Sequence, residues 1–115
     1  NPQIIAGQVE GGNSMGIGYA LSEGFSYTDG KPDQKTFGKL GLPRIHETPK
    51  YDIVIVEDPH IEGPYGAKGC SEVATVPSTP AVLNALYDAI GVRFYKTPVR
   101  PEDILSALKE KNEKS

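Results

Sequence analysis

The sequence predicts an α+β fold with a short sheet, about three helices and long loops. Two short apolar runs rich in β-branched residues, at residues 3–9 and 52–57, are typical of strands. Apolar residues recur at helical spacing in three other segments. The 115 residues include 13 glycines and 10 prolines, so much of the chain must form loops.

The first half of the chain predicts one strand, one helix and a long excursion. Residues 3–9 read QIIAGQV, and two glycines end this strand. Either Asn13 or Ser14 can then cap a helix. The helix positions expected to face the core are spaced i, i+3 and i+4: Ile17, Ala20 and Leu21. Residues 26–50 show no sustained periodicity, and loops of this length are usually functional or lie against another part of a protein.

The second half predicts a buried strand and two helices. Residues 52–57, DIVIVE, give the clearest strand, expected inside a sheet. Pro80, with a Ser or Thr before it, indicates a helix start, and Gly91 indicates its end. Pro101 opens a last helix, and the charged residues 110–115 predict a disordered tail. The core-facing positions of the two helices are Val82, Leu86, Ala89 and Ile90, then Ile104, Leu105 and Leu108.

Composition excludes several classes of function. Twelve basic and 15 acidic residues are scattered along the chain and give a net charge of −3, so a nucleic-acid partner is not expected. No apolar run approaches the roughly 20 residues of a membrane span. The single Cys70 excludes an internal disulfide and favours a reducing compartment, which we expect to be the cytoplasm. The chain fits one domain by length, and its start at Asn1 suggests a piece of a longer protein.

Two glycine-rich segments, residues 7–18 and 63–72, are the candidates for chemistry. Glycine lets a backbone approach a partner closely, because no Cβ stands in the way. Neither segment has a phosphate-binding pattern: Lys68, for example, lacks the following Ser or Thr of a P-loop. From the residues alone, tight internal packing and approach to a cofactor both remain open. Glu72, which closes the second segment, is either functional or a simple helix N-terminal acid.

The remaining polar residues predict no metal site. The histidines, Asp58 and Cys70 match no zinc-ligand spacing, so each histidine is expected to be solvated or hydrogen-bonded. Cys70 has no base near it in the sequence, and a small buried thiol is as good an interpretation as a reactive one.

Four segments, in chain order, carry a resemblance to a known family: GQVEGGNSMGIGYALSE (7–23), GPYGAKGCSE (63–72), PAVLNALYDAIGVR (80–93) and PEDILSAL (101–108). Together they resemble the C-terminal part of the molybdopterin-binding (molybdenum) subunit of the xanthine dehydrogenase and aldehyde oxidase family. The resemblance implies that residues 1–115 form the C-terminal portion of a molybdenum-cofactor-binding domain.

The resemblance also implies a reaction and its residues. Members of this family use a molybdenum–molybdopterin cofactor, in some as a dinucleotide, to add water-derived oxygen to an electron-poor carbon of an aldehyde, purine or N-heterocycle. By position, Glu72 is the catalytic base. The positions implied to bind the cofactor are Gln8, Gly11, Gly12, Ala67, Lys68, Gly69, Cys70 and Ser71. No protein ligand to the metal is expected.

The partners implied are the remainder of the molybdenum subunit, iron–sulfur and FAD subunits, and further copies in an oligomer. The isolated chain is then expected to bind no cofactor and to be inactive. Three positions depart from the family pattern: Met15 replaces a Gln, Cys70 an aliphatic residue, and Ser71 the Gly before the catalytic Glu. These departures keep open an alternative, a non-catalytic structural or assembly module that retains the fold. A free-standing nucleotide binder is disfavoured by the absent phosphate motif.

Overall fold

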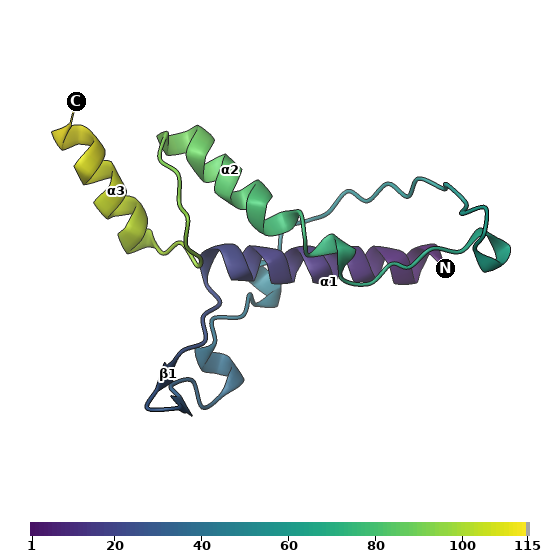
Figure 1. The fold of residues 1–115 in the computed structure, drawn as a ribbon, viewed down its shortest axis with the longest axis horizontal. Coiled ribbons are helices and arrows are strands. Elements are labelled where there is room, and N and C mark those ends of the chain that lie inside the picture. Colours follow the sequence, from purple (N-terminus) through teal and green to yellow (C-terminus); the bar gives the residue numbers. More distant parts are fainter. Residues whose placement is uncertain (115) are drawn as a thin grey trace.

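The computed structural model describes residues 1–114 and contains three helices and one small sheet (Figure 1). The helices are α1 (Pro2–Leu21), α2 (Ser78–Ile90) and α3 (Pro101–Glu113). Strands β1 (Tyr27–Thr28) and β2 (Lys31–Pro32) pair antiparallel within the long excursion. Short 3₁₀ turns interrupt the loops. The predicted combination of a short sheet, three helices and long loops is therefore confirmed.

The strand predicted at residues 3–9 and the helix start at Asn13 or Ser14 were wrong, because α1 already begins at Pro2. The side-chain oxygen of Asn1 accepts the N–H groups of Gln3 and Ile4, at 3.1 and 3.4 Å. A proline fits the first helical position, whose N–H has no intrahelical partner. The helix then continues through five glycines despite their low helix propensity, and contacts with other segments leave no room for a Cβ at three of them, Gly12, Gly16 and Gly18.

The buried core is small and lies where α1, the 3₁₀ turn Glu72–Ala74 and the start of α2 meet. The buried residues there are Gly12, Gly16, Ala74 and Ser78, and Gly18, Ala20 and Val99 are buried near the C-terminal end of α1. The N–H of Val99 donates to the carbonyl of Ala20 at 2.7 Å, which fixes the connection between α2 and α3 against the end of α1.

Most positions predicted to face a core are not fully buried. Ala20 is buried as predicted, but Leu21, Ala89 and Leu105 are exposed, so their predicted burial was wrong. The others are only partly buried. No second layer covers α2 and α3 in the part of the chain that the structure describes, so helical periodicity alone did not guarantee burial.

The strand predicted at residues 52–57 is also not formed. The segment makes no backbone hydrogen bond to any described residue. Val54 and Val56 are 85% and 83% exposed. A strand needs a neighbour to pair its N–H and C=O groups, and none lies alongside this segment among residues 1–114.

The starts of α2 and α3 and the end of α2 agree with the sequence signals. Gly91 ends α2 in the left-handed conformation, with φ of 68°. Pro101 opens α3, and the Asp103 carboxylate accepts the N–H of Arg100 at 2.8 Å. The disorder predicted for residues 110–115 was wrong up to Glu113, because α3 extends that far. Ser115 lies outside the described residues.

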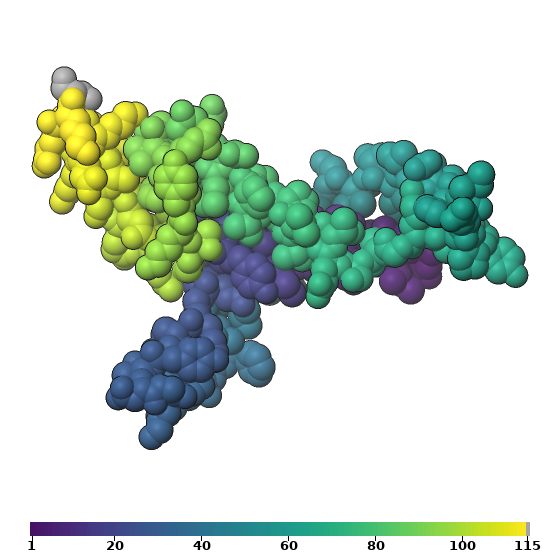
Figure 2. All heavy atoms as spheres, in the orientation of Figure 1, coloured from purple at the N-terminus to yellow at the C-terminus, as the bar shows by residue number. Residues whose placement is uncertain are grey.

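The molecule is elongated. Its radius of gyration is 18.1 Å, whereas a compact domain of this length has about 13 Å. Its accessible surface is 9234 Å², against about 6,100 Å² for a typical folded monomer of this size. The excursion with β1 and β2 projects from one side of the C-terminal end of α1, while α2 and α3 lie on the other side (Figures 1 and 2). Within residues 1–114, no helix combines the length and apolarity that crossing a membrane requires.

Candidate active site

One face of α1 and the segment that precedes and opens α2 frame a groove of about 660 Å³. Helical periodicity brings the α1 lining residues onto this face, because each lies three or four positions from at least one other member of the set. They are Gln8, Gly11, Gly12, Met15 and Tyr19. The opposite wall is made by Ser71, Glu72, Thr75, Val76 and Thr79. Two segments far apart in the sequence thus form one concave surface.

A hydrogen bond links the two walls at the end of the groove nearest Gln8. The side-chain amide of Gln8 donates to the carbonyl of Ser71 at 2.9 Å. The Ser71 hydroxyl accepts the N–H of Glu72 at 2.7 Å. Glu72 opens a 3₁₀ turn, and its exposed side chain makes no hydrogen bond to any residue between 1 and 114. The structure thereby brings together five of the nine predicted site residues: Gln8, Gly11, Gly12, Ser71 and Glu72.

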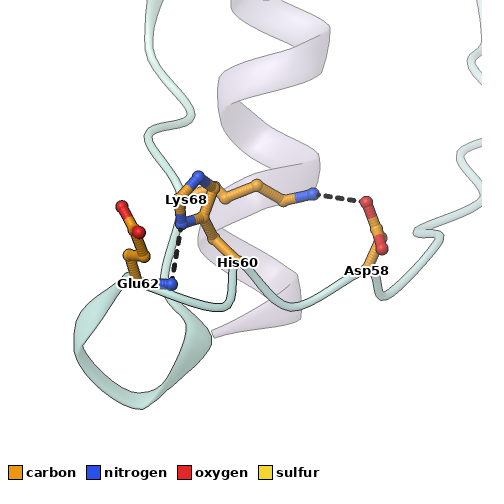
Figure 3. Close-up of polar contacts among 4 residues, drawn as sticks. All are labelled: Asp58, His60, Glu62 and Lys68. Carbon is orange, nitrogen blue, oxygen red and sulfur yellow. Dashed lines mark hydrogen bonds and ion pairs between the residues drawn. The ribbon is translucent and has the colours of Figure 1, made fainter.

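The other four predicted residues, 67–70, do not line this groove. Lys68 extends across its own loop to Asp58, with 2.9 Å between its ammonium nitrogen and a carboxylate oxygen (Figure 3). The two side chains are 48% and 82% exposed, so the ion pair adds little stability. Cys70 is exposed rather than buried. Among the described residues, the N–H groups of residues 68–70 have no hydrogen-bond acceptor.

The glycines of α1 divide into two groups. An added Cβ at Gly12 would lie 2.8 Å from the Cβ of Ala74, and one at Gly16 would collide with Ser78. These two glycines are needed for packing inside the chain. At Gly11, which faces the groove, an added Cβ would meet nothing within 4 Å, and the same holds at Gly69. Internal packing therefore accounts for only part of the glycine content.

Polar side chains hold α1 against the start of α2. The hydroxyl of Thr79 donates to the carbonyl of Gly16 at 2.8 Å. The buried Ser78 hydroxyl lies within hydrogen-bond distance of the Asn13 side-chain oxygen and 2.9 Å from the carbonyl of Ala74. These contacts fix both walls of the groove relative to each other.

The two carboxyl groups with shifted pKa values lie outside the groove. Burial raises the pKa of Glu23, and one of its oxygens is buried without a hydrogen-bond partner in residues 1–114. The hydroxyl of Ser26 donates to Asp33 at 2.6 Å and lowers the pKa of that carboxyl. No group of three or more His, Cys, Asp or Glu side chains in the described part of the chain could hold a metal ion.

Four groove residues were missed in the sequence: Tyr19, Thr75, Val76 and Thr79. Tyr19 follows Met15 by one helical turn, so continuous helical spacing from Gln8 would have indicated it. The predicted strand at residues 3–9 concealed that spacing. Thr75, Val76 and Thr79 carry no comparable signal, because their position depends on the packing of α2 against α1.

Comparison with known proteins shows what this chain is similar to. Residues 1–49 match the family described as molybdopterin cofactor-binding domain. The aldehyde oxidoreductase of Megalodesulfovibrio gigas is 44% identical over 110 residues, which are 95% of this chain and 12% of that protein. A probable xanthine dehydrogenase subunit of Bacillus subtilis (strain 168) is 34% identical over 111 residues, 96% of this chain and 15% of that protein. The chain is homologous to a short segment of these two longer proteins, an aldehyde oxidoreductase and a probable xanthine dehydrogenase subunit.

A solved structure has the same fold over this segment. The quinoline 2-oxidoreductase of Pseudomonas putida 86 matches with a TM-score of 0.86 and 31% identity. The match covers 96% of this chain and 14% of that chain. The elongated shape is thus shared with the matching part of a much longer protein. The chain spans 12–15% of the length of these relatives.

Proposed function

We propose that this chain is the part of a molybdenum hydroxylase that contributes the catalytic-base loop, with Glu72 as the base. The observation that carries the proposal is the shared groove, in which Glu72 faces Gln8 and the open glycine face of α1. Homology to oxidoreductases supports the class of reaction.

The residues present fit a molybdenum–molybdopterin cofactor. The second N–H and the oxygen of the Gln8 amide remain to hydrogen-bond the pterin. Gly11 leaves room for a bulky group against the helix. The N–H groups of residues 68–70, together with residues 67 and 71, would complete the contacts.

When bound, this cofactor would supply the oxygen atom that is transferred and would accept two electrons from the substrate. Glu72 would accept the proton of the attacking hydroxyl group as the oxygen of that group bonds to an electron-poor carbon of an aldehyde, purine or N-heterocycle. The C–H bond of that carbon would break, and its hydrogen would leave with the two electrons that the cofactor accepts. A carboxylate can act in this way only when it is ionised and within hydrogen-bond reach of the proton. The side chains of Met15, Tyr19 and Val76, at the other end of the groove from Gln8, fit the face of a flat ring.

The rest of the molybdenum subunit is the first partner that we propose, because 115 residues frame only one side of an open groove. Iron–sulfur and FAD subunits would carry the electrons away, and further copies would form an oligomer. Related proteins are named as subunits, such as the 6-hydroxypseudooxynicotine dehydrogenase complex subunit gamma of Paenarthrobacter nicotinovorans. The exposed thiol of Cys70 is compatible with a reducing compartment, and we propose the cytoplasm.

Exchange of Glu72 for Gln in the complete enzyme tests the proposal. We expect turnover to be lost while molybdenum and pterin are retained. A non-catalytic module is the alternative, favoured by Met15 in the groove at a position where the family commonly has Gln. Such a module would bind neither molybdenum nor pterin in the complete protein, so metal and pterin analysis distinguishes the two.

A further inference from the structure

We propose that Gln8 is a positioning residue for Glu72 and acts through the backbone carbonyl of Ser71. The inference rests on the proposed function, since it assigns to Gln8 the task of holding the catalytic base. It adds to the contact of Gln8 with the cofactor, because one side-chain amide has two N–H donors and one acceptor oxygen.

The Gln8 bond acts on the peptide group that joins Ser71 to Glu72. The carbonyl oxygen of this peptide accepts from the Gln8 amide at 2.9 Å, and its N–H donates to the Ser71 hydroxyl at 2.7 Å. A peptide group is planar, so two hydrogen bonds at its two ends fix the orientation of the plane. The Cα of Glu72 belongs to that plane, and the direction of its side chain is set accordingly.

The loop that carries Glu72 has few other hydrogen bonds to restrain it in the residues before Ser71. The N–H groups of residues 68–70 meet no acceptor among residues 1–114. On the following side, Ala74 packs against Gly12, and the N–H of Thr75 donates to the carbonyl of Glu72 at 2.9 Å. Gln8 lies one helical turn before Gly12 on the same face of α1. The two α1 contacts therefore anchor residues 71–74 at both ends.

The helix is a suitable support for this task. Gln8 lies 63 residues before Ser71 in the sequence, so the bond joins two separate segments. The backbone of α1 is held by its own hydrogen bonds and is more rigid than a loop. Without the Gln8 donor, the Ser71–Glu72 peptide can rotate, and the carboxylate of Glu72 can turn towards solvent.

The test compares variants of the complete holoenzyme. Gln8→Met keeps the side-chain length and removes the donor; Gln8→Asn keeps the amide but is one methylene too short to reach Ser71. We expect both to lower kcat about tenfold, the size of one lost hydrogen bond. KM should stay unchanged, and the remaining contacts of the cofactor should keep the molybdenum and pterin content near that of the wild type. Gln3→Met is the matched control, because the Gln3 side chain lies on the same helix and bonds to no described residue.

A double-mutant cycle separates positioning from direct action on the cofactor. If Gln8 acts through Glu72, adding Gln8→Met to a Glu72→Gln enzyme should cause no further loss of kcat. The same tenfold loss in both backgrounds would overturn the proposal, as would loss of molybdenum from either Gln8 variant or activity equal to that of Gln3→Met. If Glu72→Gln alone keeps most of its activity, the proposed function itself fails, which is a distinguishable result.

Discussion

Gly16 of α1 lies so close to Ser78 at the start of α2 that a side-chain carbon on Gly16 would collide with the Cβ of Ser78. The same added carbon would come within 3.0 Å of the carbonyl oxygen of Thr75, which is backbone and cannot rotate away. The approach of α2 to α1 thus depends on the absence of a side chain at residue 16. It sets the distance between the two walls of the groove.

This contact predicts that two Gly-to-Ala exchanges in α1 change the free energy of unfolding in opposite directions. Gly16→Ala should lower the free energy of unfolding of the chain by about 1–3 kcal/mol, because it forces α1 and α2 apart. Gly7→Ala should raise it by about 0.5–1 kcal/mol, because its Cβ meets nothing within 4 Å and alanine favours helix. Urea unfolding followed by circular dichroism measures both. Equal effects of the two exchanges would contradict the tight contact.

The 115-residue chain on its own should self-associate. Its surface exposes apolar side chains, including Val54 and Val56, that water disfavours. Sedimentation at increasing concentration should show a growing share of larger species. The double variant Val54→Lys/Val56→Lys should reduce this self-association. The control Asn84→Lys/Asn112→Lys adds the same charge at exposed polar positions and should not reduce it. A monodisperse monomer at high concentration would count against a missing covering surface.

The same chain should retain no stoichiometric molybdenum or pterin after purification. The groove is open and framed from one side, so too few contacts would surround the cofactor. The complete protein should carry both groups. Metal analysis and the fluorescence of oxidised pterin give the two contents, and tight retention by these 115 residues would show that the groove binds the cofactor unaided.

Glu23 should make the stability of the chain depend on pH. Burial raises the pKa of its carboxyl above the ordinary value, so the folded chain holds this proton more tightly than the unfolded chain. The corresponding stability is present at pH values below the unfolded pKa and is lost as pH rises through the folded pKa. Glu23→Gln should therefore gain stability relative to the wild type as pH rises, in thermal unfolding between pH 4 and 8. The exposed Glu57→Gln is the control; a pH-independent difference at Glu23 would refute the burial effect.

The sequence was sufficient to predict those helix boundaries whose signals lie in the neighbouring residues. Proline at the start and glycine at the end of a helix act on their own residues, so the bounds of α2 and the start of α3 could be predicted. In α1 the β-branched residues Ile4 and Ile5 gave residues 3–9 a composition typical of a strand. The contacts that leave no room for a side chain at residues 12 and 16 come from Ala74 and Ser78, far along the chain, and no local pattern could show them.

Contacts between residues far apart in the sequence also explain the other differences between the prediction and the structure. Residues 52–57 have the composition of a strand, but a strand forms only where a second one pairs with it. The family resemblance indicated Gln8 and Glu72 as site residues. The bond from Gln8 to the Ser71 carbonyl could not be predicted, because it depends on how the loop lies against α1.

The exchange of Glu72 for Gln in the complete enzyme tests the catalytic base most directly. The amide keeps the size of the side chain and a hydrogen bond but cannot accept the proton. We predict that kcat falls by at least about 10²-fold, the low end for the loss of a general base, with molybdenum and pterin content unchanged. Glu62→Gln, in the same loop but outside the groove, should keep full activity. A Glu72→Gln enzyme that retains most of its activity would contradict the assignment of Glu72 as the base.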